Sequence, residues 1–454
     1  MSSKSVYDWS SSPDDPSYYT RRQWGFEILN DVLTRQKHQT PMFLGADIAA
    51  ERPFVTTSLL EHARNAWVSL RFTLPTLAAH TEQDTEGNAL LTYRTALSAA
   101  DAQAWAGRTL QFHEEHKTLD GLHKKLRGTH IPDANGDQTF LHLIVRSDTS
   151  FAVLLYTSHV TFDGASAKIV ITRFLKKLAL LLDGGSPDLN LKWGDEYSNL
   201  TPAVVRVLGP NEVVEGDQYG ETLNSVMTGF GAALAYGHGF KFRGRTGPGP
   251  TRHLGLPLSV SDTSKLLQFA KSNGLTVNQV VHAALMMVCV FDNPPTADTP
   301  ADAAVATLGI VNPRYRLQSA YSGRDERDRA VDRSAHVLKT EYLKQKAYPS
   351  LLAILQHDAP PWMRPSYVGD GRGEDYLDRD YPGGDGTTIL DLDEFFMSVF
   401  QAFSWRDRLF LSVNYNEHTM TAKRLRLGWT NGQNCFGRFP KRRRGLSEDV
   451  RVEH

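Results

Sequence analysis

Three residues, His159, Asp163 and Gly164, stand at a spacing that suits proton-transfer chemistry. They belong to the segment His159-Val160-Thr161-Phe162-Asp163-Gly164. A histidine exchanges protons near neutral pH because its unperturbed pKa is about 6.5, so His159 is a candidate general base. Asp163 is suited to cap a helix or to pair with an arginine, and Gly164 permits a tight bend that presents the imidazole. The other interpretation is a buried core histidine followed by a helix cap, and local features leave both open.

The elements around this segment place His159 at the end of a strand. Residues 139–146 and 151–157 both have the composition of strands, and Ser147–Ser150 between them predicts a hairpin turn. Residues 165–182 carry apolar side chains at helical spacing and are followed by Asp183-Gly184-Gly185, which ends the helix. Side chains at strand ends tend to face clefts rather than cores, which favours a functional histidine.

The rest of the chain mixes helical and strand patterns, so the predicted fold class is α/β in a mixed α+β arrangement. Helices are predicted over 21–37, 58–72, 99–119, 261–272 and 277–290, and strands over 90–94, 304–311, 394–403 and 409–415. Residues 229–252 are rich in glycine and follow no period. They predict a crossover linker between an N-terminal half, residues 1–228, and a C-terminal half, residues 253–454.

Composition narrows the function classes. The net charge of −1 supplies no global basic field, so we expect no nucleic-acid partner. The two cysteines, Cys289 and Cys435, lie far apart, which fits a reducing compartment. The N-terminus lacks an apolar segment, and the apolar run Val280–Phe291 is too short to span a bilayer. We therefore expect a soluble, cytoplasmic protein without a membrane partner.

Other candidate groups have ordinary interpretations. The run His113-Glu114-Glu115-His116 has the wrong order and spacing for a metalloprotease helix, and we interpret it as a solvated helix face. His282 lies in an apolar helix and is interpreted as a core histidine, and Lys441–Arg444 as a solvated basic tail. No spacing of ligand residues predicts a metal site.

With its flanking elements, the segment from His159 to Gly164 resembles the HxxxDG acyltransferases. This superfamily includes chloramphenicol acetyltransferase, peptide-synthetase condensation domains and fungal trichothecene O-acetyltransferases, and the fungal secondary-metabolite members are the most similar in appearance. Thr276, which opens an apolar helix, and the strand that ends in Val311–Arg316 also agree with the family pattern. The resemblance covers residues 25–430. The plant members carry Asp-Phe-Gly-Trp-Gly near the C-terminus, and this chain has only the fragment Leu427-Gly428-Trp429.

The resemblance implies a fold, a site and a set of partners. The fold would be two chloramphenicol-acetyltransferase-like halves with a tunnel between them. His159 Nε2 would be the general base, and Asp163 would pair with Arg314 as first choice or Arg316 as second. Candidate oxyanion or substrate contacts are Ser412, Asn414, Tyr415 and His418. The other interpretation of the first three is the ordinary polarity of a strand, and it is the more common one. A small-molecule acceptor with a hydroxyl or amine would react with acyl-CoA or an acyl carrier protein, in a monomer without a permanently bound cofactor.

Two other functions remain compatible with the sequence. A condensation-like cyclase or pericyclase would use the same tunnel to fold a polyketide without an acyl donor. A non-enzymatic protein would bind a ligand in a relic tunnel. Dependence on a thioester donor separates acyl transfer from cyclisation, and turnover separates either enzyme from a binding protein.

Overall fold

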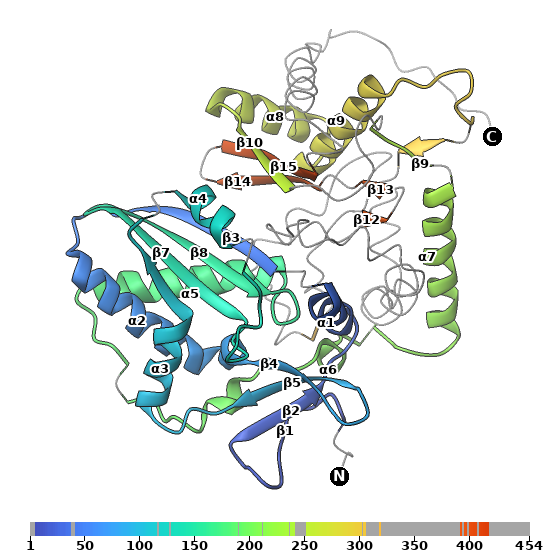
Figure 1. Ribbon diagram of the computed structural model, residues 1–454. Coiled ribbons are helices and arrows are strands. Elements are labelled where there is room, and N and C mark those ends of the chain that lie inside the picture. Colours follow the sequence, from blue (N-terminus) through green and yellow to red (C-terminus); the bar gives the residue numbers. More distant parts are fainter. Residues whose placement is uncertain are drawn as a thin grey trace.

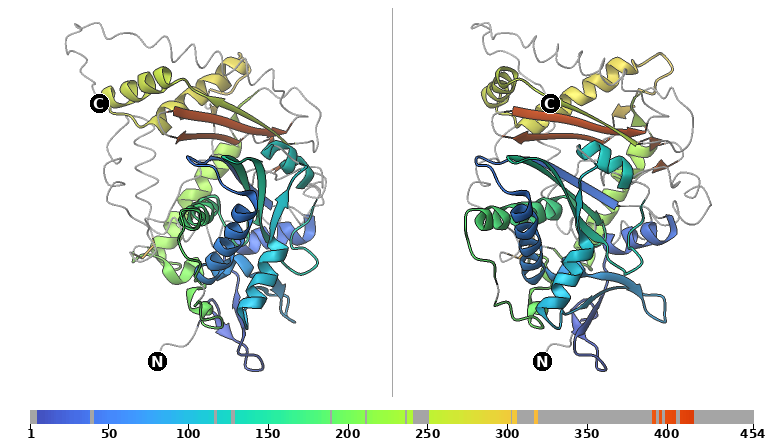
Figure 2. Two further views of the ribbon diagram at one scale, coloured as in Figure 1. Left: turned by 90° about the vertical axis from the view of Figure 1, so that its left-hand side faces the viewer. Right: turned by 60° about the vertical axis from the view of Figure 1, so that its left-hand side comes forward.

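The structure is a computed structural model that describes residues 5–37, 41–115, 118–126, 129–188, 190–210, 212–235, 237–240, 251–301, 303–305, 317–318, 391–392, 395–396, 399–405 and 408–416. The described residues form two lobes, one above the other in Figure 1. The N-terminal lobe lies below, and the C-terminal lobe, with two helices and a three-stranded sheet, lies above it. Figure 2 shows the same separation from two further sides. The predicted two-lobed α/β architecture is confirmed.

The N-terminal lobe contains two four-stranded sheets. Its strands are β1 (Ser10–Ser11), β2 (Tyr18–Arg22), β3 (Pro41–Ala49), β4 (His80–Gln83), β5 (Ala89–Arg94), β6 (Leu110–His113), β7 (Thr139–Ser147) and β8 (Ser150–Ser158). Its helices are α1 (Phe26–Lys37), α2 (Thr56–Thr73), η1 (Pro75–Ala78), α3 (Ala99–Thr109), α4 (Leu119–Leu126), α5 (Gly164–Leu182), η2 (Glu196–Asn199) and α6 (Val204–Val207). The strand orders are β1-β2-β5-β4 and β3-β8-β7-β6, antiparallel except for the parallel pair β6 and β7.

The predicted hairpin is the centre of the second sheet. β7 pairs with β8 in a register that places Thr139 opposite Thr157, and β3 pairs with the other edge of β8. The connection is shorter than predicted, with only Asp148 and Thr149 between the strands, because β7 continues to Ser147 and β8 begins at Ser150. A tight connection of this kind fixes the register of the two strands and thereby the point at which β8 ends.

Both faces of this sheet are buried, which explains the nearly continuous apolar sequence of β8. Phe151, Val153 and Leu155 join the core under the helices, whereas Leu154 and Tyr156 join a smaller cluster under α4. Side chains alternate between the two faces of a strand, so a strand that is covered on both faces needs apolar residues at every position. Helices α2 and α5 lie side by side on the larger core, as Figure 1 shows.

The helix predicted over residues 99–119 is wrong in its second half. Helix α3 ends at Thr109, and Leu110–His113 form β6, which runs parallel to β7. Leu110 and His113 at the two ends of β6 are buried and Gln111 is exposed, so the burial of these four residues does not follow a simple two-residue period. The pairing partner lies about thirty residues further along the chain, so the local pattern alone did not indicate it.

The C-terminal lobe packs two helices against a three-stranded sheet. Its elements are β10 (Thr251–Pro257), α8 (Val260–Ser272), α9 (Val277–Asp292), β14 (Val399–Trp405) and β15 (Arg408–Asn416), with the short strands β9 (Gly237–His238), β11 (Ala304–Val305), β12 (Asp391–Leu392) and β13 (Phe395–Phe396). The central strand β15 pairs antiparallel with both β10 and β14. Leu266 of α8 and Val280 of α9 form a core with Leu409. The predicted helix pair and the strand over 409–415 are therefore confirmed.

Thr276 caps α9, as its position before the apolar run predicted. Its hydroxyl accepts the backbone N–H of Gln279 at 3.3 Å, and the Gln279 side chain accepts the N–H of Thr276 at 2.8 Å. This reciprocal capping box satisfies two backbone donors at the helix start.

No single helix among the described residues is long and apolar enough to cross a membrane. Helices α8 and α9 reach that length and composition only as a pair bent by 103°.

Helix α7 (Asp217–Ala235) runs along the side of the molecule from the lower lobe to the upper one (Figure 1). It occupies the first part of the glycine-rich stretch predicted as a crossover linker, and β9 follows it at residues 237–238. Residues 241–250 of that stretch lie outside the described residues. The boundary between the two halves, near residues 229–252, stays a prediction.

Helix α5 is predicted to depend on Phe174 for its position on the sheet. Phe174 is fully buried and meets the ring of Trp67 edge to face, with 6.2 Å between the ring centroids. We expect Phe174→Ala to lower the free energy of unfolding by about 3–5 kcal/mol, because the substitution leaves a cavity between α5 and α2. Urea unfolding measures this loss. The adjacent, exposed Arg173→Ala is the control and should change it by about 0.5 kcal/mol or less. A loss below about 1 kcal/mol for Phe174→Ala would contradict the role of Phe174 in holding α5 on the sheet.

Candidate active site

His159 lies in the turn between β8 and α5. The last residue of β8, Ser158, is held in place by a hydrogen bond from its N–H to the carbonyl of Gln138, at 2.9 Å. The Ser158 hydroxyl accepts the N–H of Val160 at 3.2 Å, and the Ser158 carbonyl accepts the hydroxyl of Thr161 at 3.1 Å. The single residue Ser158 therefore satisfies several polar groups of the turn and limits the conformations that it can adopt.

The side chains of the turn divide between the core and the surface. Val160 is 4% exposed and Phe162 is 7% exposed, and Phe162 belongs to the main core of the lobe. His159 and Thr161, which alternate with them, are partly exposed. The two apolar side chains anchor the turn in the core of the lobe, whereas His159 and Thr161 contribute to it only in part.

Asp163 caps α5, as predicted from the sequence. Its carboxylate accepts the N–H of Ser166 at 2.7 Å and the hydroxyl of the same residue at 2.5 Å. A carboxylate at this position satisfies a backbone donor that the helix leaves free and interacts favourably with the positive end of the helix dipole. The structure thus assigns Asp163 a definite role at the start of α5. Its predicted partners, Arg314 and Arg316, lie outside the described residues.

The bend that we predicted from Gly164 does not require glycine. Gly164 is the first residue of α5 and is not among the glycines with positive φ. A Cβ atom built there meets no atom of the described residues within 4 Å. The change of direction is made by residues 159–163, and Asp163 itself has an extended backbone with φ −91° and ψ 172°. That part of the prediction is corrected.

Burial is the main influence on the pKa of His159. It lowers the pKa from the usual 6.5, while the backbone of His159 itself, the charge of Asp163 and the backbone of Phe162 act in the opposite direction. The net direction is downward, so the imidazole is neutral at pH 7. A neutral imidazole has a free lone pair and is the form that accepts a proton.

The predicted contacts from the C-terminal half fall on or after β15. Ser412 lies in the middle of this strand, opposite Gly255 of β10 and Gln401 of β14. Asn414 is opposite His253 and Val399, and Tyr415 is opposite Arg252. His418 lies outside the described residues. Figure 1 shows the sheet that contains β15 directly above the N-terminal lobe, next to β3 and α4.

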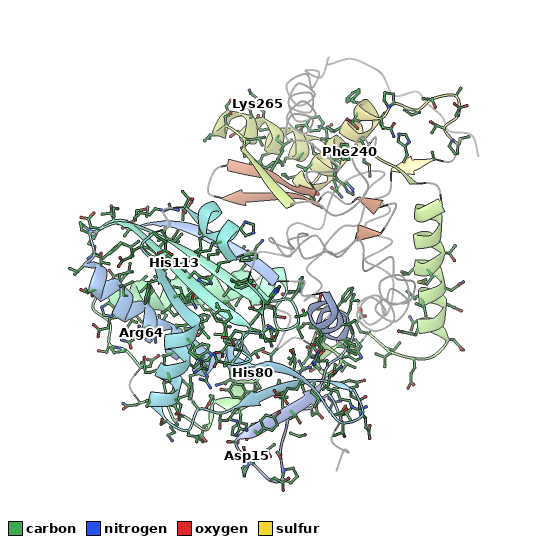
Figure 3. The ribbon with its side chains drawn as sticks, viewed as in Figure 1. Asp15, Arg64, His80, His113, Phe240 and Lys265 are labelled. Atoms are coloured by element: carbon green, nitrogen blue, oxygen red, sulfur yellow. The ribbon has the colours of Figure 1, made fainter. Side chains whose placement is uncertain are left out.

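The interpretation of residues 113–116 as a solvated helix face is wrong for His113. This residue ends β6 and is buried, and its Nε2 lies 2.9 Å from Nδ1 of His142 on β7. The pair lies on the α4 side of the sheet, and Figure 3 labels His113 within the lobe. Burial, His113 and Lys125 lower the pKa of His142 to about 3. This pair belongs to the interior of the sheet and not to the turn with His159.

Asn30 was not among the residues predicted from the sequence. This residue lies in α1, and its Nδ2 donates a hydrogen bond to the backbone oxygen of His159 at 3.3 Å. The signal in the sequence was a polar residue next to Leu29 in a helix with clear apolar spacing. In the structure both residues are buried. Only the structure shows which group Asn30 contacts.

Among the described residues, no group of three or more His, Cys, Asp or Glu is arranged to hold a metal ion.

Two lobes of mixed helix and sheet, with a histidine in the turn that leaves the central hairpin of the first lobe, define a class of protein. They place the chain in the HxxxDG superfamily, with the fold of chloramphenicol acetyltransferase and the condensation domains. The sequence matches the 15-O-acetyltransferase Tri3 family over residues 3–348. The chain therefore belongs to the 15-O-acetyltransferase Tri3 family, and it is an acyltransferase.

Individual relatives agree with this assignment. Trichothecene O-acetyltransferase TRI3 of Trichoderma arundinaceum is 22% identical, over 90% of this chain and 92% of its own length. The structure of TRI3 trichothecene 15-O-acetyltransferase from Fusarium sporotrichioides superposes with a TM-score of 0.74 at 17% identity, covering 95% and 97% of the two chains. The first condensation domain of the calcium-dependent antibiotic synthetase gives a TM-score of 0.52 at 14% identity, with 90% and 94% covered. The two structures support the fold.

We expect Asp163→Ala to weaken both stability and activity. Loss of the cap at α5 should lower the free energy of unfolding by about 1 kcal/mol, and the turn that carries His159 should become less ordered. Asp163→Asn is the matched variant, because an amide oxygen can still accept the Ser166 N–H, and it should recover most of the stability. Thermal melting and steady-state kinetics measure the two effects. An unchanged melt with lost activity in Asp163→Ala would contradict a capping role.

His142 should make the protein sensitive to acid. The unfolded chain takes up a proton at His142 as the pH falls below about 6.5, whereas the folded chain does so only near pH 3. Stability is therefore lost as the pH falls through this window, by at most about 1.4 kcal/mol per pH unit from this group. His142→Gln should reduce the slope, and the exposed His130→Gln should not. Urea unfolding at pH 7.5 and pH 5 tests this. Equal slopes in wild type and His142→Gln would contradict it.

Proposed function

We propose that this protein transfers an acetyl group from acetyl-CoA to a hydroxyl of a trichothecene-class metabolite, with His159 as general base. The observation that carries the proposal is the match to the 15-O-acetyltransferase Tri3 family over residues 3–348. Two proteins that this chain matches over more than nine-tenths of their length, 92% and 97%, are trichothecene O-acetyltransferases by name. His159 is partly exposed as a residue, and burial lowers the pKa of its imidazole, so the neutral ring is available as a base.

In the proposed reaction, His159 takes the proton of the acceptor hydroxyl. The oxygen attacks the thioester carbonyl carbon, and the carbonyl oxygen acquires a negative charge. When this intermediate collapses, the carbon–sulfur bond breaks and the thiolate of coenzyme A receives the proton from the imidazolium. The products are the acetyl ester and free coenzyme A. General-base catalysis contributes about 10²–10⁴-fold, so alignment of the two substrates must supply much of the remaining acceleration.

The C-terminal lobe is the proposed source of the oxyanion donor. The candidates in β15 are Ser412, Asn414 and Tyr415, because β15 is the central strand of the sheet above the N-terminal lobe (Figure 1). Arg314, or else Arg316, is the proposed partner of Asp163. A donor in the opposite lobe would stabilise the developing charge only when both lobes hold the substrates, which ties catalysis to correct alignment.

Acetyl transfer is favoured over the donor-independent cyclisation that the sequence left open. The family and the curated relative are both acetyltransferases. The structural likeness to condensation domains rests on fold alone and gives cyclisation no separate support. A carrier-protein thioester is the other source of the acyl group, and direct comparison of donors distinguishes it from acetyl-CoA.

The test combines a donor, an acceptor and a variant of the base. Purified protein, acetyl-CoA and a trichothecene alcohol should release free coenzyme A and yield the monoacetylated product, both detectable by thiol assay and mass spectrometry. His159→Ala should lose about 10²–10⁴-fold in kcat, whereas the exposed His130→Ala should not. Product formed without a thioester, or full transfer by His159→Ala, would refute the proposal.

The pH dependence gives an independent check on the base. Because the pKa of His159 lies below its usual 6.5, kcat/KM should be constant near neutrality and should fall only at a pH below 6.5, as the imidazole becomes protonated. A pH–rate profile with wild-type protein measures this limb, with stability recorded at each pH. A limb above pH 7 would contradict the lowered pKa.

A further inference from the structure

Asn30 reaches the turn of His159 from a distant part of the sequence. It lies in α1, its side chain is only 4% exposed, and its Nδ2 donates to the backbone oxygen of His159 at 3.3 Å. The two residues are 129 positions apart. A backbone oxygen can only accept, so the amide must present its NH₂ group to it, which fixes the orientation of the Asn30 side chain.

The same backbone region also interacts with the imidazole of His159. The backbone of His159 and, to a smaller extent, the backbone of Phe162 raise the pKa of the His159 ring, which is the effect of acceptor oxygens close to a ring N–H. Only Nδ1 lies near enough to the main chain to reach the carbonyl of its own residue. A carbonyl oxygen has two lone pairs, so it can accept Asn30 Nδ2 and the ring N–H together.

This arrangement affects the tautomer of the histidine. A carbonyl held in a fixed direction beside Nδ1 favours the neutral form with the proton on Nδ1, which leaves the lone pair on Nε2. If the peptide group between His159 and Val160 were free to rotate, its oxygen would no longer hold the Nδ1 proton in place. The contact from Asn30 opposes that rotation.

Helix α1 is itself held firmly, as a positioning element must be. Asp31, the neighbour of Asn30, forms an ion pair with Arg35 one turn further along the helix, at 2.7 Å. Leu29, next to Asn30, is 1% exposed. A group on a packed helix holds its partner more accurately than one on a loop.

We propose that Asn30 is a positioning residue for His159: through the His159 carbonyl it fixes the orientation and the neutral tautomer of the imidazole. The consequence for turnover rests on the proposed acetyl transfer. The consequence for the imidazole itself does not, because it follows from the hydrogen bond alone.

The experiment compares Asn30→Leu and Asn30→Ala with Thr34→Val. Leucine keeps the branched shape of asparagine without its donor, and alanine covers the case in which leucine does not fit. Thr34→Val removes a buried hydrogen bond of the same helix, from the Thr34 hydroxyl to the Asn30 carbonyl at 2.8 Å. It leaves the Asn30 side chain and its contact with His159 in place, so it controls for loss of helix stability. Thermal melting checks the fold of each protein. Steady-state kinetics and nitrogen-15 NMR of the histidine rings, with the His159 signals assigned from His159→Ala, report on function and tautomer.

Both Asn30 variants should lower kcat by about tenfold or more, with the KM for acetyl-CoA changed by about threefold or less, because a displaced base is poorly aligned. The Nδ1–H tautomer of His159 should lose population. The pKa of its ring should fall further, since a displaced carbonyl no longer accepts from the ring N–H, and the acid limb should move to lower pH. Thr34→Val should show none of these changes.

Other results overturn the proposal. If the Asn30 variants match Thr34→Val in kcat, tautomer and acid limb, or if neither Asn30 variant folds, Asn30 has a purely structural role. Failure of acetyl transfer is a separate result, seen as absence of turnover by wild type or full turnover by His159→Ala. In that case the NMR comparison still decides whether Asn30 sets the tautomer of the His159 ring.

Discussion

The site depends on a short connection between a sheet and a helix that pack on each other. Only five residues, 159–163, connect the end of β8 to the start of α5, and both elements belong to the main core. Ser158 and Asp163, at the two ends of this connection, use their oxygens to satisfy its free backbone groups. Val160 and Phe162 are buried, and the positions that alternate with them, His159 and Thr161, are only partly buried. The placement of His159 is therefore a consequence of the packing of the whole lobe.

Burial lowers the pKa of two histidines in this lobe, with different chemical consequences. His142 lies within β7, 2% exposed and paired with His113, so no substrate can reach its ring. His159 lies just beyond the end of β8 and is partly exposed. Both rings are neutral at pH 7 because desolvation disfavours the charged form. Position relative to the strand end, more than the pKa, separates the proposed general base from the structural residue.

The sequence predicted the elements whose signals are local. The hairpin of β7 and β8, the helix α5 and the cap at Thr276 follow from alternation, apolar spacing and cap chemistry. The prediction from the sequence was wrong for β6, whose four residues become a strand only by pairing with β7. It was also wrong for His113, which is buried by that pairing. It also assigned Gly164 a bend that the backbone of residues 159–163 makes without it. Short elements and isolated polar residues take their environment from distant chain segments, which local pattern cannot indicate.

Asn30 shows the same limit for the site. A polar residue on the buried side of an amphipathic helix signals that a hydrogen-bond partner exists, because an unpaired buried amide is costly. The identity of the partner depends on where α1 lies relative to the β8–α5 turn, and that is set by packing. Family resemblance has the same limit. The family motif identifies the histidine that is proposed to accept the proton, but a residue that acts through a backbone oxygen belongs to no motif. At 17–22% identity to its relatives, contacts of this second kind have to be found in the structure of the chain itself.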